Sequence, residues 1–153
     1  MGRVARFPAM PYAVKKLDVW TGTIEGRVGG LASKLEPLAR AGIDLQFLVA
    51  RRHPHLPGRG VVFLSGIAGA KGTKAAAAAG LAKARDVVAL RVEGPNKAGA
   101  AYQITCRLAD AGINLRGVSA GVVGKKFELL LAFDNAADAD KAALAVRAAG
   151  RKK

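Results

Sequence analysis

Residues 38–45 read LARAGIDL, and this stretch decides the fold because residues 108–115 repeat it as LADAGINL. The two copies stand 70 positions apart (108 − 38) and differ only where Asp110 replaces Arg40 and Asn114 replaces Asp44. Repetition of a segment at a fixed spacing indicates a duplicated structural unit. The sequence therefore predicts two related modules rather than one undivided domain.

The segments before the repeat predict a strand and then a helix in each copy. The β-prone runs 19–25 and 87–93 each end at a glycine, and a glycine-containing loop follows. Apolar residues then recur at helical spacing, and the glycine of the repeat suits the left-handed residue that ends a helix. The expected helical faces carry Leu31, Leu35 and Leu38 in the first copy and Ala101, Ile104, Leu108 and Ala111 in the second, and the terminating glycines are Gly42 and Gly112.

Two strands and a second helix complete each copy. Second helices are expected at about 74–84 and 136–149. The order strand, helix, strand, strand, helix predicts an α+β fold of two tandem ferredoxin-like βαββα modules, with antiparallel sheets and helices on one face. Apolar alternation predicts one strand face from Ile43, Leu45, Phe47 and Val49, and another from Phe127, Leu129, Leu131 and Phe133.

Both copies are expected to lack the fourth strand that normally closes a ferredoxin-like sheet. The first copy runs from its second helix straight into 87–93, and only residues 150–153 follow the second copy. The resulting free edge would be covered by pairing between the copies or between chains. The second face of the strands is also expected to be apolar and packed against a sheet, module or subunit. The residues assigned to that face are Leu48, Val62, Leu64, Val118 and Leu130.

The net charge of +14 raises the possibility of a polyanionic partner. Residues 1–85 carry 14 basic and 4 acidic side chains, and residues 86–153 carry 11 and 7. No run of five or more like charges occurs, so a basic solvated surface is favoured over a nucleic-acid tail.

Catalysis and metal binding are not indicated. Both histidines, His53 and His55, lie in one proline-containing loop rich in arginine, and no nucleophile with a partnered base stands out. The single cysteine, Cys106, excludes an internal disulfide and a multi-cysteine metal site. No apolar run approaches the length of a membrane span, and no secretory signal is present, so a cytoplasmic, non-enzymatic protein without a cofactor is expected.

The loops and the repeat together resemble the core of ACT domains. Residues 94–99 read GPNKAG and lead through a helix into the second repeat, and residues 26–30 read GRVGG and lead into the first. The family loop usually reads Asp-(Arg/Lys)-Pro-Gly; the basic residue and the glycine match in both copies, whereas the acid and the proline do not. The resemblance implies an N-terminal extension at 1–16 that could be disordered, ACT modules at 17–85 and 86–149, and a basic tail at 150–153.

ACT domains typically bind amino acids or other small metabolites at interfaces between modules, and they commonly dimerise. The loop chemistry agrees, because a helix start offers unpaired N–H groups and a positive dipole to a carboxylate. The second loop is the better candidate, since Asn96 can cap a helix and Gly26 cannot. The resemblance implies ligand-binding residues Asn96, Lys97, Ala98, Gly99, Ala100 and Asn114, and in the first copy Gly26, Arg27, Val28, Gly29, Gly30 and Asp44.

The resulting prediction is a non-catalytic regulatory protein that binds a small molecule, an amino acid in the first instance, and forms a homodimer or higher oligomer. Two alternatives stay open. One is a nucleic-acid binder on the same fold, for which Phe63, Phe127 and Phe133 are the aromatic residues of the central strands. The other is a structural adaptor that binds a partner protein through an apolar sheet face or an edge strand.

Overall fold

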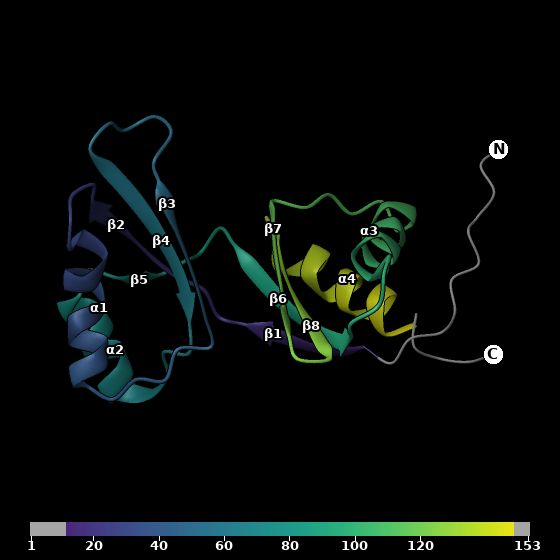
Figure 1. Cartoon of the computed structure of the whole chain (residues 1–153), viewed down its shortest axis with the longest axis horizontal. Coiled ribbons are helices and arrows are strands. Elements are labelled where there is room, and N and C mark those ends of the chain that lie inside the picture. The colour runs from purple at the N-terminus through teal and green to yellow at the C-terminus, as the bar shows by residue number, and fades with distance from the viewer. Residues whose placement is uncertain (1–11, 149–153) are drawn as a thin grey trace. The chain divides into compact units, whose positions relative to one another are not determined.

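The computed structural model describes residues 12–148, which divide into two compact units. The first module is Leu17–Arg85, and the second module combines the residues up to Lys16 with those from Asp86 onward. The first module is thus inserted between the N-terminal segment and the body of the second. Figure 1 shows the two units with their labelled elements.

The first module is a four-stranded sheet with two helices. Its strand order is β3-β4-β2-β5, and the neighbouring strands pair antiparallel. The elements are β2 Trp20–Glu25, α1 Gly30–Arg40, β3 Phe47–Arg52, β4 Arg59–Ser65, α2 Gly69–Ala78 and β5 Ala82–Lys83.

The second module repeats this plan in the order β1-β6-β8-β7. Strand β8 pairs antiparallel with both β6 and β7. The elements are β1 Ala13–Leu17, β6 Val88–Pro95, α3 Ala100–Asp110, β7 Gly117–Val123, β8 Lys126–Phe133 and α4 Ala136–Ala148. The expected α+β class with antiparallel sheets is confirmed.

The expectation that both copies lack a fourth strand is wrong. In the first module β5 pairs with β2, and in the second module β1 lies beside β6. Strand β5 is only two residues long, too short to show a periodic pattern, and α2 begins and ends earlier than expected. Strand β1 stands far upstream of the rest of its module, and all of its residues except Leu17 fall within the range 1–16 that was assigned to an extension. Nothing local in the sequence connects it to β6.

Each module has its own hydrophobic core between its sheet and its helices. Leu38 of α1 and Leu108 of α3, which are equivalent in the repeat, are both 1 % exposed. The first core contains Leu38, Val62, Leu64, Ile67, Ala75, Ala76, Ala79 and Leu81. The second contains larger side chains, including Leu90, Ile104, Leu108, Phe127, Leu129, Leu131, Phe133 and Val146.

The assignment of residues to the second sheet face is wrong for most of its members. Val62 and Leu64 are fully buried in the helix-side core, and Leu48 packs against them. The error comes from carrying the alternation of Ile43 and Leu45 into β3, although both precede the strand, which begins at Phe47. The chain is irregular between Leu45 and Phe47, so the alternation of inward and outward side chains does not continue into the strand. Phe47 and Val49 therefore lie on the face away from the helices.

The second module shows the same kind of error at one position. Val118 pairs with Leu131 and so lies on the helix side of the sheet, but it remains 48 % exposed. Leu130 lies on the opposite face, as expected, because it alternates with the buried Leu129 and Leu131.

Candidate functional site

A cavity of about 280 Å³ opens at the start of α3 in the second module. It lies where β6 ends and the chain turns into the helix, which is where the sequence predicts a binding loop. One wall comes from the loop and the first turn of α3, and the other comes from β7 and β8. The lining residues are Asn96, Lys97, Gly99, Ala100, Ala101, Tyr102, Ala120, Gly121, Val122, Phe127 and Leu129.

Backbone hydrogen bonds hold the loop in place. The Asn96 N–H donates to the Lys125 carbonyl oxygen at 2.9 Å, which ties the loop to the β7–β8 turn. The Ala100 N–H donates to the Lys97 carbonyl oxygen at 3.2 Å and closes the turn before α3. Gly99 has φ of +85°, a left-handed conformation that strains any residue with a side chain. Gly29 has the same conformation at the equivalent place in the first module, with φ of +79°.

The cavity has an apolar floor and an open rim. Phe127 and Leu129 of β8 are 7 % and 1 % exposed and form the floor. Strand β7 is exposed along its whole length and is an edge of the sheet. Tyr102, one turn into α3, is 62 % exposed, and a hydrogen bond with the Cys106 side chain raises the pKa of its phenol.

The structure brings together most of the residues expected in the second loop. Asn96, Lys97, Gly99 and Ala100 line the cavity, whereas Ala98 is exposed beside it. Asn114 is not among the lining residues; it is exposed, and its Oδ1 accepts the N–H of Leu115 at 3.0 Å.

The wall from β7 and the aromatic Tyr102 were missed at the level of sequence. Ala120, Gly121 and Val122 belong to a strand whose sequence, GVSAGVV, carries no polar signal beyond one serine. Their proximity to the loop follows only from the pairing of β7 with β8. Tyr102 could have been found, because it lies in the first turn of the expected helix.

The first loop has the same backbone but different surroundings. Arg27 forms an ion pair with Glu25 and also donates to the Val28 carbonyl oxygen at 3.3 Å. Val28 is 99 % exposed, and Gly30 packs against the backbone of Glu25, where a side chain would not fit. Gly26 donates its N–H to the Gly58 carbonyl oxygen at 2.9 Å, and Asp44 is exposed. The basic residue of this loop is thus already engaged within the module.

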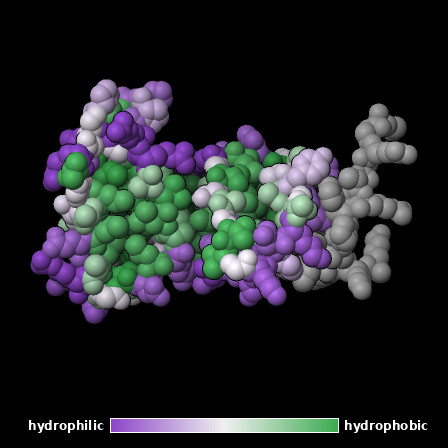
Figure 2. All heavy atoms as spheres, in the orientation of Figure 1, coloured by the Kyte–Doolittle hydropathy of each residue, from purple (hydrophilic) through white to green (hydrophobic). Residues whose placement is uncertain are grey.

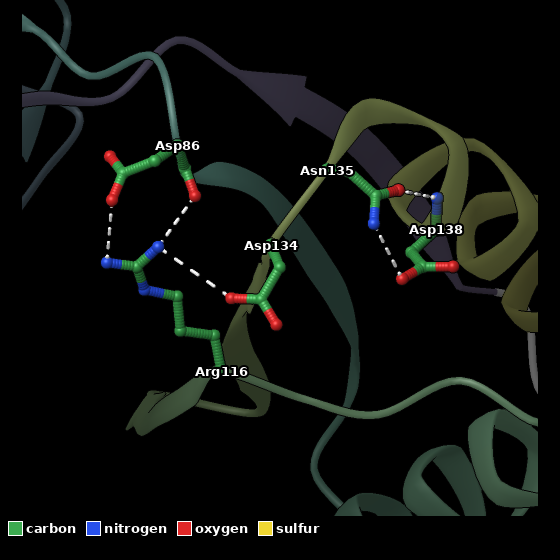
Figure 3. Close-up of polar contacts among 5 residues, drawn as sticks. All are labelled: Asp86, Arg116, Asp134, Asn135 and Asp138. Atoms are coloured by element: carbon green, nitrogen blue, oxygen red, sulfur yellow. Dashed lines mark hydrogen bonds and ion pairs between the residues drawn. The ribbon is translucent and has the colours of Figure 1, made fainter.

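An arginine near the end of the α3–β7 connection ties two strand ends of the second module together (Figure 3). Arg116 Nη2 lies 3.0 Å from Asp86 Oδ2, and its Nη1 donates to the Asp86 carbonyl oxygen at 2.6 Å. The same guanidinium lies 3.7 Å from Asp134. Next to it, Asn135 Oδ1 accepts the Asp138 N–H at 2.8 Å and caps α4. The hydrogen bond from Arg116 lowers the pKa of Asp86 below its ordinary value of 3.8.

Replacing Arg116 by glutamine is expected to weaken the dependence of stability on pH at the acid end. A carboxyl group whose pKa is lower in the folded state adds stability above its unfolded pKa and loses it as the pH falls through the folded pKa. This contribution is present at neutral pH and is lost below about pH 3.8. Urea denaturation at several pH values between neutral pH and pH 2 measures the free energy of unfolding and hence this contribution. Lys141→Gln, which removes the same charge from an exposed position of α4, is the control; equal pH profiles for the two variants would contradict the assignment.

The described part of the chain offers neither a metal site nor a membrane-spanning helix. Between residues 12 and 148, no group of three or more His, Cys, Asp or Glu side chains could hold a metal ion. No helix in that range is long and apolar enough to cross a membrane.

Residues 88–150 match the sequence profile of the ACT domain family. No curated protein sequence is detectably similar to the chain. Among solved structures, the regulatory subunit of aspartate kinase from Thermus thermophilus is 14 % identical, with a TM-score of 0.64 over 94 % of this chain and 99 % of that one. A protein from Bacteroides thetaiotaomicron is 17 % identical, with a TM-score of 0.69 over 88 % of this chain and 89 % of its own. The regulatory subunit of aspartate kinase from Thermus flavus is 16 % identical, with a TM-score of 0.60 over 95 % of this chain and 100 % of that one. At these identities the likeness establishes the fold alone.

Proposed function

We propose that the protein is a non-catalytic regulatory protein that binds an amino acid, because residues 88–150 match the sequence profile of the ACT domain family. The observation that carries this proposal is the cavity at the start of α3, which coincides with the loop predicted from sequence. Regulatory subunits of aspartate kinase share the fold, and a regulatory role for this chain accords with that likeness. The single cysteine accords with a reducing compartment, and we place the protein in the cytoplasm.

The cavity suits a small zwitterion with an apolar or small side chain. Its volume of about 280 Å³ is near the lower end of the range for ligand sites. The start of α3 and the Lys97 ammonium both favour a carboxylate. The floor of Phe127 and Leu129 favours an apolar side chain. No acidic side chain lines the cavity, so the ligand's ammonium group would bind backbone carbonyl oxygens.

We further propose that a second copy of the chain covers the open side of this cavity along β7. All seven residues of β7 are exposed, and Val118, Val122 and Val123 are 48, 57 and 77 % exposed. An exposed, uncharged edge strand tends to pair with another strand. Pairing two β7 strands across a twofold axis would shield these valines and reduce the access of water to the ligand.

A panel of the common amino acids at millimolar concentration, followed by calorimetric titration of those that raise the Tm, tests the proposal. A ligand at a hundred times its Kd is expected to stabilise the chain by about 2.7 kcal/mol. Ala120→Leu should abolish the shift, because Ala120 pairs with Leu129 and faces the cavity. Ser119→Leu is the matched control, since its side chain lies on the opposite face of the same strand.

Lys97→Gln should weaken binding roughly tenfold, the effect of losing one charge-assisted contact of about 1.4 kcal/mol. The absence of a shift with every amino acid, or an equal effect of the two leucine variants, would overturn the proposal. The mass of the ligand-bound protein, measured by sedimentation, tests the second copy separately; a dimer is expected.

A further inference from the structure

The first module presents a sheet face that its own helices do not cover. Both α1 and α2 contribute to the core on the side of Val62 and Leu64. We call the opposite side the open face; the pairing of β3, β4 and β2 assigns residues to it. Its members are Thr21, Thr23, Glu25, Phe47, Val49, Arg51, Arg59, Val61 and Phe63.

Two phenylalanines occupy diagonal positions on neighbouring strands of the open face. Phe63 is in the central strand β4 and pairs with Val49 on one side and Thr21 on the other. Phe47 pairs with Ser65, which makes it a diagonal neighbour of Phe63, about 7–8 Å away between Cα atoms. Both phenylalanines are partly exposed. Phe127 and Phe133, the other aromatic candidates for a nucleic-acid surface, are instead buried in the second core.

The hairpin end of the same face is basic. Arg51 pairs with Val61 and Arg59 pairs with Glu25, so the two arginines are diagonal neighbours beyond the rings. Both are exposed, and neither makes an ion pair with another described residue. Glu25 is the one acid among the face residues. Arg27 forms an ion pair with it, and the charge of Arg59, which lies opposite it in the strand pairing, also lowers the pKa of its carboxyl group. Figure 2 shows hydrophobic residues gathered over the strands of this module, with hydrophilic residues at the hairpin end.

The equivalent face of the second module has a different chemistry. Arg91 pairs with Leu130, and Glu93 pairs with Glu128. Arg91 Nε lies 3.0 Å from Glu93 Oε1, so its charge is compensated on the face itself. No aromatic residue occupies this face among the paired residues of β6, β7 and β8. The combination of two rings with more arginines than acids is therefore specific to the first module, whose open face carries Arg51 and Arg59 against Glu25.

We propose that the open face of the first module binds single-stranded nucleic acid. Flat, partly exposed rings on the central strands of a sheet stack unpaired bases, and neighbouring arginines neutralise the phosphates. The charge favours a polyanion over a second copy of the chain on this face, because a twofold axis along the strands would bring Arg51 and Arg59 of both copies together. A polyanion meets no such repulsion. The open face belongs to the first module and the cavity to the second, so the two proposals can fail independently.

Fluorescence anisotropy with labelled oligouridylate of about 12 nucleotides, a length within the range of single-strand sites, tests the proposal on the full chain. Phe63→Leu should weaken binding roughly tenfold, because leucine keeps an apolar side chain but cannot stack a base. Phe63→Tyr should retain the affinity. Leu130→Ala is the control at the equivalent position of the second module and should leave binding unchanged.

The charge contribution is tested with a pair of double variants. Arg51→Gln with Arg59→Gln should lower the slope of log Kd against log salt by about 1.4, which corresponds to two phosphate contacts on a single strand. Lys71→Gln with Lys74→Gln removes the same charge from α2 and should not change the slope. Binding that is equally sensitive to both pairs, or insensitive to Phe63→Leu, would overturn the proposal. So would a self-association that Phe63→Leu abolishes without any binding of the oligonucleotide.

Discussion

A chain that begins at Leu17 is expected to lose the ordered structure of the second module while the first module remains folded. Removing β1 exposes the side of β6 that it covers and deletes contacts to both helices of the module. The Tyr12 hydroxyl donates to Gln103 Oε1 at 2.6 Å in a buried bond. Lys16 Nζ lies 3.0 Å from Asp140, and Arg147 donates to the Val14 carbonyl oxygen at 3.0 Å. The buried Tyr12–Gln103 bond alone is expected to account for about 1–3 kcal/mol.

The same truncation should abolish amino-acid binding. The Tyr12 ring contacts Phe127 edge-on, with ring centroids 5.8 Å apart, and Phe127 forms the cavity floor. Tyr12 also fills the space above Gly94, where an added Cβ would come within 2.8 Å of its ring. Losing the Tyr12 ring removes a packing contact from one side of Phe127.

Hydrogen exchange resolved by residue, on the full and truncated chains, measures the effect. Amides of β6, β8 and α3 should lose protection, whereas those of β2 and β4 should keep it. A synthetic peptide covering the deleted residues should restore protection when added in excess. Tyr12→Phe is the milder control, because it removes only the hydroxyl. Unchanged protection in the truncated chain would show that β1 is dispensable.

Leu108→Ala is expected to destabilise the second module by about 3–5 kcal/mol. Leu108 is 1 % exposed on α3, and its removal leaves a cavity between the helix and the sheet. Leu38→Ala at the equivalent position of α1 should destabilise the first module by a similar amount. The two variants form a matched pair, because the same side chain is removed from the same place in each copy.

Urea denaturation followed by residue-resolved signals from both modules distinguishes the two effects. Each substitution should shift the transition of its own module to lower urea concentration. Leu144→Ala, at a position of α4 that is 69 % exposed, should change neither transition by more than about 0.5 kcal/mol. A single shared transition that both variants move equally would show that the modules unfold together.

The repeat, the helices and the loop before α3 could be predicted because their signals are local. LARAGIDL and LADAGINL place Leu38 and Leu108 on the buried faces of α1 and α3, and Gly42 and Gly112 adopt the expected left-handed conformation after those helices. Helical spacing and capping chemistry act within a few residues, so they can be read without a structure.

Tertiary structure alone decided how the sheets are completed, which face of each strand is buried, and what lies opposite the loop. Strand β1 pairs with a strand some 70 residues away, and no local pattern encodes such a partner. The irregular segment before Phe47 interrupts the alternation of inward and outward side chains. In β3, Phe47 therefore faces away from the helices and Leu48 faces the core. Strand β7 reaches the cavity only through its pairing with β8. The sequence by itself determined two modules and the loop that lines the cavity. Long-range strand pairing determined the other wall of that cavity and the aromatic, basic face of the first module.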